Sequence, residues 1–294
     1  MNDRIFQILE YIPPPMREEI ASAASGLHNV EEIRLRADLP ISIFSNGKSH
    51  QIDGGVTAAA DIQSIFTAVC EHSVYAYLEE IKQGFITVNG GHRVGICGRA
   101  IVRNGEIENI KDISGLNFRI AREVIGCADK IFGEIISANQ EVESTLIISP
   151  PQCGKTTMLR DLARQCSNFG LNVSVVDCRG EIAACYRGVA QNDLGANVDV
   201  LDGAPKAAGM MMLLRSMSPQ VLVTDEIGGD DDIFAVSQGM SGGVAVIASV
   251  HGAEVDHVLR NEKYAPLFGK CGFSNIVSLS RRNGAGTIEE VRKL

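Results

Sequence analysis

The chain has 294 residues, of which 45% are hydrophobic and 21% are charged, and these proportions exclude a largely disordered protein. A chain of this length is usually too long to fold around a single hydrophobic core, so we expect two domains. The formal net charge of −9 argues against a dedicated nucleic-acid-binding protein, which would need a broad basic surface to displace counterions.

The first part of the chain predicts helices mixed with antiparallel strands. Apolar spacing indicates two short helices on either side of the prolines at residues 13–15. Alternating residues then predict three strands, at residues 31–36, 40–45 and 48–53. A helical stretch is expected from Asp61 to about Gln83, and three β-rich segments follow it. We therefore expect an α+β domain at residues 1–140.

The second part predicts a different architecture. Its strands are short, continuous apolar runs, at residues 144–149, 172–177, 220–226, 244–250 and 275–280. Runs of this kind, alternating with helical segments, are typical of a mainly parallel sheet that helices cover on both faces. We therefore expect an α/β domain at residues 141–294.

Residues 149–157, SPPQCGKTT, resemble the phosphate-binding pattern G-x-x-x-x-G-K-[ST], with Ser149 in place of the first glycine. A predicted strand enters this segment and a predicted helix leaves it, an arrangement that favours an anion. Gly154 would let the backbone approach phosphate, Lys155 would neutralise the outer phosphates, and Thr156 would bind Mg²⁺. The alternative is a Gly-Lys-Thr turn before an ordinary helix. The expected nucleotide-binding residues are Ser149, Pro150, Pro151, Gln152, Cys153, Gly154, Lys155, Thr156 and Thr157, with ATP and Mg²⁺ as the bound groups.

Acidic and imidazole side chains follow three other predicted strands. In VLVTDE, Asp225 is the expected partner of Thr156 at the metal, and Glu226 is the group expected to polarise the attacking water. The alternative is that both acids cap the next helix. Further candidates are Asp177 and Glu181 in VVDCRGE and His251 in ASVHG, which should border the same crevice. A histidine after a buried strand is more often structural, so its assignment depends on the other motifs.

Three segments resemble motifs of the secretion ATPase superfamily, the ring ATPases of type II and type IV secretion and of pilus assembly. LLRSMSPQVLVTDEIG is similar to the Walker B region of that superfamily, VVDCRGE to its acidic box and SVHG to its histidine box. Within the superfamily, the chain most resembles a family of sporulation proteins from endospore-forming bacteria. The resemblance implies a RecA-like P-loop ATPase domain. It gives Lys155 and Thr156 a nucleotide-binding role and Glu226 the catalytic one.

The chain also departs from the superfamily pattern. Walker B of the superfamily usually has glycine before its glutamate and arginine shortly after it, whereas this chain has Asp225 before Glu226 and Gly228-Gly229 after it. Because of this departure, slow hydrolysis of ATP is an open alternative. Ring ATPases normally complete the site with an arginine from another subunit or domain. Four arginines are candidates for that position: Arg93, Arg99, Arg119 and Arg122.

These observations predict a Mg²⁺-dependent ATPase that forms a homo-oligomer, expected to be a hexamer. By resemblance, it would power or assemble a secretion-like channel complex during endospore formation, between mother cell and forespore. We expect it to be cytoplasmic and held at the membrane by a membrane-embedded partner, because no apolar window approaches the roughly 18 to 20 residues that span a bilayer. The alternatives are a nucleic-acid-dependent P-loop ATPase and a nucleotide-gated scaffold with little hydrolysis.

Overall fold

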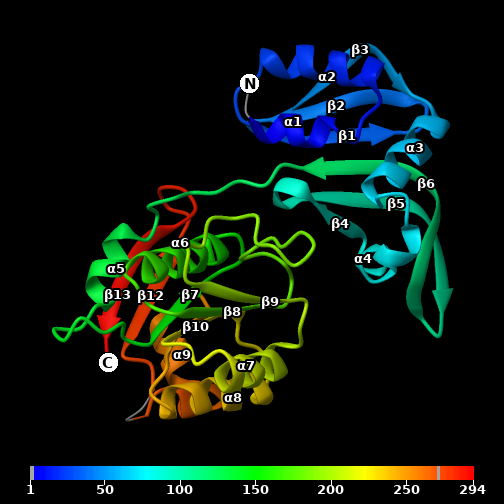
Figure 1. Ribbon diagram of the computed structural model, residues 1–294. Helices are drawn as coiled ribbons and strands as arrows, with labels where there is room; N and C mark the ends of the chain where they lie inside the picture. Colours follow the sequence, from blue (N-terminus) through cyan, green and yellow to red (C-terminus); the bar gives the residue numbers. More distant parts are fainter. Residues whose placement is uncertain (1–2, 270–271) are drawn as a thin grey trace. The chain divides into compact units, whose positions relative to one another are not determined.

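The computed structural model describes residues 3–269 and 272–294, and the chain divides into two compact units (Figure 1). The first unit ends at Arg122 and the second begins at Glu123, earlier in the chain than the sequence-based boundary at residue 140. The difference arises because Ala128, Ile131 and Ile135 are fully buried in a core of the second unit.

The first unit contains a six-stranded antiparallel sheet in the order β3-β2-β1-β6-β5-β4. Its strands are β1 (Val30–Arg36), β2 (Leu39–Ser45), β3 (Lys48–Thr57), β4 (Phe85–Val88), β5 (His92–Arg103) and β6 (Glu106–Arg119). Its α-helices are α1 (Asp3–Leu9), α2 (Pro14–Ser25), α3 (Ala59–Val69) and α4 (Leu78–Gln83). Helix residues such as Ile8, Ile20 and Ile65 share one core with Ile33 and Phe118 of the sheet. This arrangement confirms the predicted α+β class.

One expected element of this unit is interrupted. The helical stretch predicted from Asp61 to Gln83 consists of α3, a short 3₁₀ helix (Val74–Tyr77) and α4. Glu71 and His72 have φ of 50° and 62°, in the left-handed region, so a right-handed helix cannot continue through them. Apolar spacing did not reveal this turn, since buried residues occur on both sides of it.

The second unit contains a seven-stranded sheet in the order β13-β12-β7-β11-β10-β8-β9. Its strands are β7 (Thr145–Ser149), β8 (Val173–Asp177), β9 (Val198–Asp202), β10 (Val221–Glu226), β11 (Ala245–His251), β12 (Asn275–Ser280) and β13 (Thr287–Lys293). Its helices are α5 (Asp129–Ile135), α6 (Lys155–Asn168), α7 (Lys206–Ser216), α8 (Asp230–Ser241), α9 (Val255–Arg260) and the 3₁₀ helix η3 (Glu262–Leu267). Strand β13 pairs antiparallel with β12, and the other neighbours are parallel. The predicted, mainly parallel α/β class is confirmed.

Helices cover both faces of this sheet. In Figure 1, α5 and α6 lie on one face, and α7, α8 and α9 lie on the other. Strand β10 serves both cores, because Val223 packs in the core that includes Leu159 of α6, whereas Leu222 packs in the core that includes Met210 of α7. Burial on both faces explains why the central strands are continuous apolar runs.

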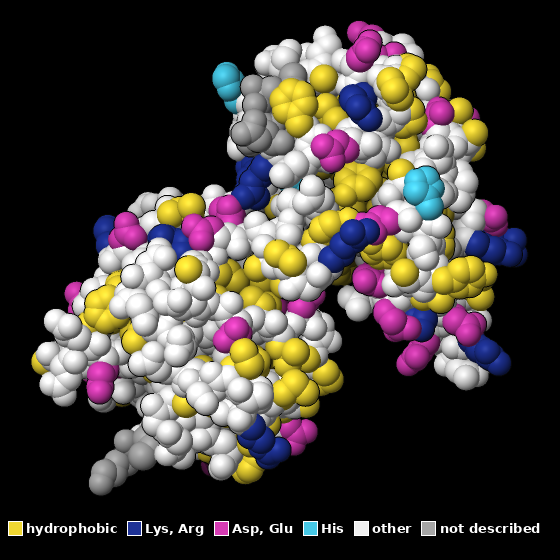
Figure 2. Space-filling view, in the orientation of Figure 1, with side chains coloured by type: hydrophobic (Ala, Val, Ile, Leu, Met, Phe, Trp, Pro, Cys, Tyr) yellow, Lys and Arg dark blue, Asp and Glu magenta, His cyan; other side chains and the backbone are white. Residues whose placement is uncertain are grey.

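Two surface properties bear on possible partners. Across the described residues, no helix is both long enough and apolar enough to cross a bilayer. On the face shown in Figure 2, Lys and Arg side chains are scattered among Asp and Glu and form no continuous basic area. That face therefore lacks the electrostatic footprint expected of a nucleic-acid-binding surface.

Candidate functional site

The parallel strands bring the candidate residues to one edge of the second unit's sheet. His251 at the end of β11 pairs in register with Ser149 at the end of β7. On the other side of β11, Ser249 pairs with Glu226 at the end of β10. Strand β8, which ends at Asp177, is the next neighbour of β10. The carboxyl edge of such a sheet is where ligands bind in α/β folds, so the predicted residues share one candidate site.

The phosphate-loop segment forms a tight turn between β7 and α6. Gly154 has φ of 90°, and a Cβ atom there would lie 2.9 Å from Gly286 N, too close for any other residue type. The Gly286 N–H donates to Cys153 O at 2.8 Å. Ser149, by contrast, does not have a left-handed backbone conformation, so a serine fits where the usual pattern has glycine.

The Lys155 side chain lies over the start of this loop. Its ammonium donates to Ser149 O at 3.0 Å and to Pro150 O at 3.3 Å. Burial lowers the pKa of Lys155, and the negative charge of Glu226 opposes that change. Lys155 begins α6 directly after the loop that leaves β7, and Glu226 ends β10, so both lie at the same edge of the sheet.

Asp177 shapes the loop that carries Glu181. It is fully buried, and its carboxylate accepts backbone N–H bonds from Glu181 at 2.9 Å, Ile182 at 2.9 Å and Ala183 at 2.8 Å. Burial raises the pKa of Asp177 and Asp225 raises it further, while the backbone donors act in the opposite direction. Both carboxylate oxygens of Asp177 thus accept hydrogen bonds from this loop. Glu181 is less buried than Asp177.

Two residues that sequence reasoning missed hold the same loop from outside. Arg160 of α6 donates to Glu181 O at 2.7 Å and to Ile182 O at 2.8 Å. The Asn192 amide also donates to Ile182 O, at 2.8 Å. The sequence shows that Arg160 lies on the predicted helix that begins with Lys155. It does not show which loop the Arg160 side chain contacts.

The end of β10 is held by a lysine that was not predicted. Lys206, the first residue of α7, places Nζ 2.7 Å from Asp225 Oδ1, although not along a hydrogen-bonding direction. The same ammonium donates to the main-chain oxygen of Glu226. Glu226 itself is exposed at the strand end. The two adjacent acids therefore have different surroundings.

Mg²⁺ was expected at Thr156 and Asp225. Within residues 3–269 and 272–294, no three His, Cys, Asp or Glu side chains gather as a metal site. Mg²⁺ in phosphate-binding sites usually takes one or two protein ligands together with phosphate oxygens, so Thr156 in the first turn of α6 fits such a metal. Asp225 fits less directly, because an ammonium already neutralises its carboxylate.

The four candidate arginines lie in the first unit. The Arg93 guanidinium lies 4.5 Å from the centroid of the Phe85 ring, and Arg119 lies 3.9 Å from Glu32. Arg122 donates to two main-chain oxygens of the same unit. Arg99 is exposed on β5, where its backbone pairs with Lys111, and among the described residues its side chain has no hydrogen-bonding or ionic partner.

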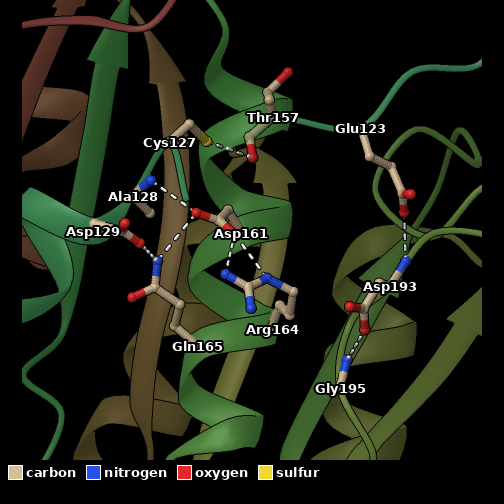
Figure 3. A network of polar contacts seen from close by, with 10 residues as sticks. All are labelled: Glu123, Cys127, Ala128, Asp129, Thr157, Asp161, Arg164, Gln165, Asp193 and Gly195. Carbon is tan, nitrogen blue, oxygen red and sulfur yellow. Dashed lines mark hydrogen bonds and ion pairs between the residues drawn. The ribbon is translucent and has the colours of Figure 1, made fainter. Parts of the chain in front are cut away.

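A polar network joins the beginning of the second unit to the phosphate-loop helix (Figure 3). Asp161 of α6 is buried, and its carboxylate accepts from Ala128 N at 2.8 Å and from Arg164 Nε at 2.8 Å. The Gln165 amide donates both to Asp161 and to Asp129. The segment before α5 is thus fixed to the helix that begins with Lys155.

Comparison with known proteins connects this geometry to a family. The model of the family described as "Sporulation stage III, protein AA" matches residues 2–293. Stage III sporulation protein AA of Bacillus subtilis (strain 168) is 37% identical over 291 residues, covering 97% of this chain and 94% of that protein.

Two solved structures are similar in fold. The pilus retraction motor PilT with bound ADP has a TM-score of 0.61 and 16% identity, covering 88% of this chain and 76% of that one. The ATPase DotB of Legionella pneumophila has a TM-score of 0.58 and 15% identity, covering 91% and 76%. The fold of this chain is therefore similar to the folds of these two proteins.

Replacing Asp161 with Asn should weaken the second unit in a pH-dependent manner. Burial raises the pKa of Asp161, but its hydrogen bonds outweigh burial, and the net pKa lies below the ordinary value of 3.8. A lowered pKa contributes stability that is complete above the unfolded-state value and is lost as pH falls through the folded-state value. We expect Asp161→Asn to lower the free energy of unfolding near pH 7 by about 1–3 kcal/mol.

Urea titrations at several pH values, followed by circular dichroism, measure this effect. The difference between wild type and Asp161→Asn should shrink below about pH 4. Asp129→Asn is the matched control, because Asp129 is exposed and contacts the same Gln165 amide at 2.9 Å. Equal losses in the two variants would contradict the assignment.

Proposed function

The chain belongs to the sporulation stage III, protein AA family, and we propose that it is an ATPase that powers or assembles a secretion-like channel complex during endospore formation. The observation that carries this proposal is that the loop of residues 149–157 and Glu226 lie at the same carboxyl edge of the sheet, on either side of β11. The family and the secretion-type ATPase fold support it.

ATP would bind with its phosphates at the loop of residues 149–157. The N–H groups at the start of α6 and the Lys155 ammonium are the donors available for phosphate oxygens. Mg²⁺, when bound with the nucleotide, would neutralise phosphate charge, with Thr156 as its protein ligand. Asp177 would position Glu181, and His251 would lie beside the loop because it pairs with Ser149.

Hydrolysis would take place at the end of β10. Glu226 accepts a proton from water as the water oxygen bonds to the terminal phosphorus and the bond from that phosphorus to the ADP oxygen breaks. Glu226 suits this role because it is exposed, whereas the neighbouring Asp225 is paired with Lys206. The products are ADP and phosphate, and the proton then leaves Glu226 to solvent.

We extend the proposal to the assembly. A homo-oligomer, expected to be a hexamer, would let one subunit supply an arginine to the site of another, and Arg99 is the first candidate because its side chain is exposed and unpaired among the described residues. The protein would act from the cytoplasm on a membrane-embedded partner, and cycles of ATP binding and hydrolysis would drive that partner.

Replacing Lys155 with Ala should weaken ATP binding by about 10-fold to 100-fold, because a charged hydrogen-bond donor to phosphate is lost. Titration with a fluorescent ATP analogue measures the change. Lys130→Ala, at an exposed lysine of α5, is the control and should bind like wild type. Unchanged binding in Lys155→Ala would remove the phosphate-loop assignment.

Replacing Glu226 with Gln should leave ATP binding nearly unchanged and slow turnover by about 10²-fold to 10⁴-fold, since the amide cannot accept the proton. Phosphate release under saturating ATP measures turnover. Glu181→Gln is the comparison, because that acid lies in the neighbouring loop. Turnover that persists in Glu226→Gln and stops in Glu181→Gln would move the catalytic role to Glu181.

ATP turnover per subunit should rise with protein concentration if an arginine from another subunit completes the site. Light scattering on the same samples gives the mass of the assembly. Arg99→Ala should then assemble like wild type and turn over slowly. Turnover by a monomer, independent of concentration, would contradict the intersubunit site, and strong stimulation by single-stranded RNA or DNA would favour a nucleic-acid-dependent ATPase instead.

A further inference from the structure

Lys206 occupies an unusual position for a surface lysine. It is the first residue of α7, and its side chain reaches the end of β10 with only 14% of its surface exposed. The Asp225 side chain that it approaches is 12% exposed. An ammonium and a carboxylate that are both largely withdrawn from water depend on each other, because either one alone would remain as an uncompensated buried charge.

The backbone that Lys206 contacts lies next to an irregularity in the strand ladder. The pairing of β10 with β11 shifts between Val223 and Glu226, and regular bonding resumes only where Ile227 N donates to Ser249 O at 2.8 Å. Lys206 donates to the main-chain oxygen of Glu226, the first paired residue after this irregularity. It therefore fixes the backbone from which the proposed catalytic side chain extends.

Side chains also hold the residues that follow. Lys263 of η3 donates to Gly228 O. Asp232 of α8 accepts from Gly228 N at 2.9 Å and from Gly229 N at 3.3 Å. Lys263 thus makes the same kind of backbone contact as Lys206, two residues further along, but without a carboxylate partner in β10.

The charges at this edge explain why a cation is needed. Asp177 ends β8, and Asp225 and Glu226 end the neighbouring strand β10, so three carboxylates lie at this edge. Burial is the main cause of the raised pKa of Asp177, and Asp225 adds to it. A polyphosphate bound at residues 149–157 would meet this negative charge. Lys155 offsets it on the phosphate-loop side, and Lys206 offsets it on the α7 side.

We propose that Lys206 is a positioning residue that neutralises Asp225 and fixes the backbone at Glu226, so that polyphosphate can bind beside this acidic edge. It acts through Asp225 and does not contact the nucleotide. Asp225 then serves as the partner of Lys206, and Thr156 is the residue that would hold Mg²⁺ when nucleotide is bound. This inference rests on the proposed nucleotide site, but its structural part can be tested without nucleotide.

The test is a double-mutant cycle of Lys206→Met, Asp225→Asn and the two together, with Lys263→Met as the matched control. The first readout is the thermal midpoint without nucleotide. Lys206→Met should lower it by about 5 °C, because Asp225 is left buried and unpaired, and adding Asp225→Asn should recover most of the loss. Lys263→Met should change it little.

The second readout is the dissociation constant of a fluorescent ATP analogue in excess chelator, where no divalent cation can mask the carboxylate. Lys206→Met should raise it by about tenfold, and the double variant should return it near the wild-type value. Equally weakened binding of the analogue in Lys206→Met and in the double variant would show that Lys206 contacts the nucleotide directly, and this result would overturn the proposal. An unchanged dissociation constant in both variants would also overturn it. If wild type binds no analogue, the proposed function fails, and the thermal cycle still decides whether Lys206 compensates Asp225.

Discussion

Parallel hydrogen bonding of β7, β11, β10 and β8 is the constraint on which the candidate site depends. Parallel strands end at the same edge, so residues far apart in the sequence meet there without any direct attraction between them. Three carboxylates, those of Asp177, Asp225 and Glu226, lie at this edge, and their surroundings differ. Asp177 binds backbone N–H groups, Asp225 binds an ammonium, and Glu226 remains exposed.

The strands of this sheet could be predicted because burial on both faces leaves a plain apolar signature in the sequence. Strands β9 and β13 gave no such signature, since each lies at an edge of the sheet and is only partly buried. In the first unit, the positive φ of Glu71 and His72 was equally hidden, because neither residue type requires that backbone conformation.

The residues of the candidate site likewise include some that the sequence indicated and some that it did not. Lys155 and Thr156 could be proposed because their spacing along the chain is itself the motif, and Glu226 because it follows an apolar strand in a segment that resembles Walker B. Arg160 and Lys206 could not, since each acts on a loop that lies next to it only after folding. The structure also shows what surrounds the residues that depart from the usual Walker B pattern. Asp225, which replaces glycine, is paired with Lys206. The backbone of Gly228-Gly229 is bound by the side chains of Lys263 and Asp232.

The contact between Gly154 and Gly286 has a consequence for how the protein is made. A ribosome completes residues 149–157 long before it reaches the turn between β12 and β13, yet that turn supplies the N–H bound by Cys153 O and packs against Gly154. The nascent phosphate loop therefore lacks one of its walls until the last strands emerge and pair. A chain that stops short of β13 would therefore carry residues 149–157 without this supporting wall.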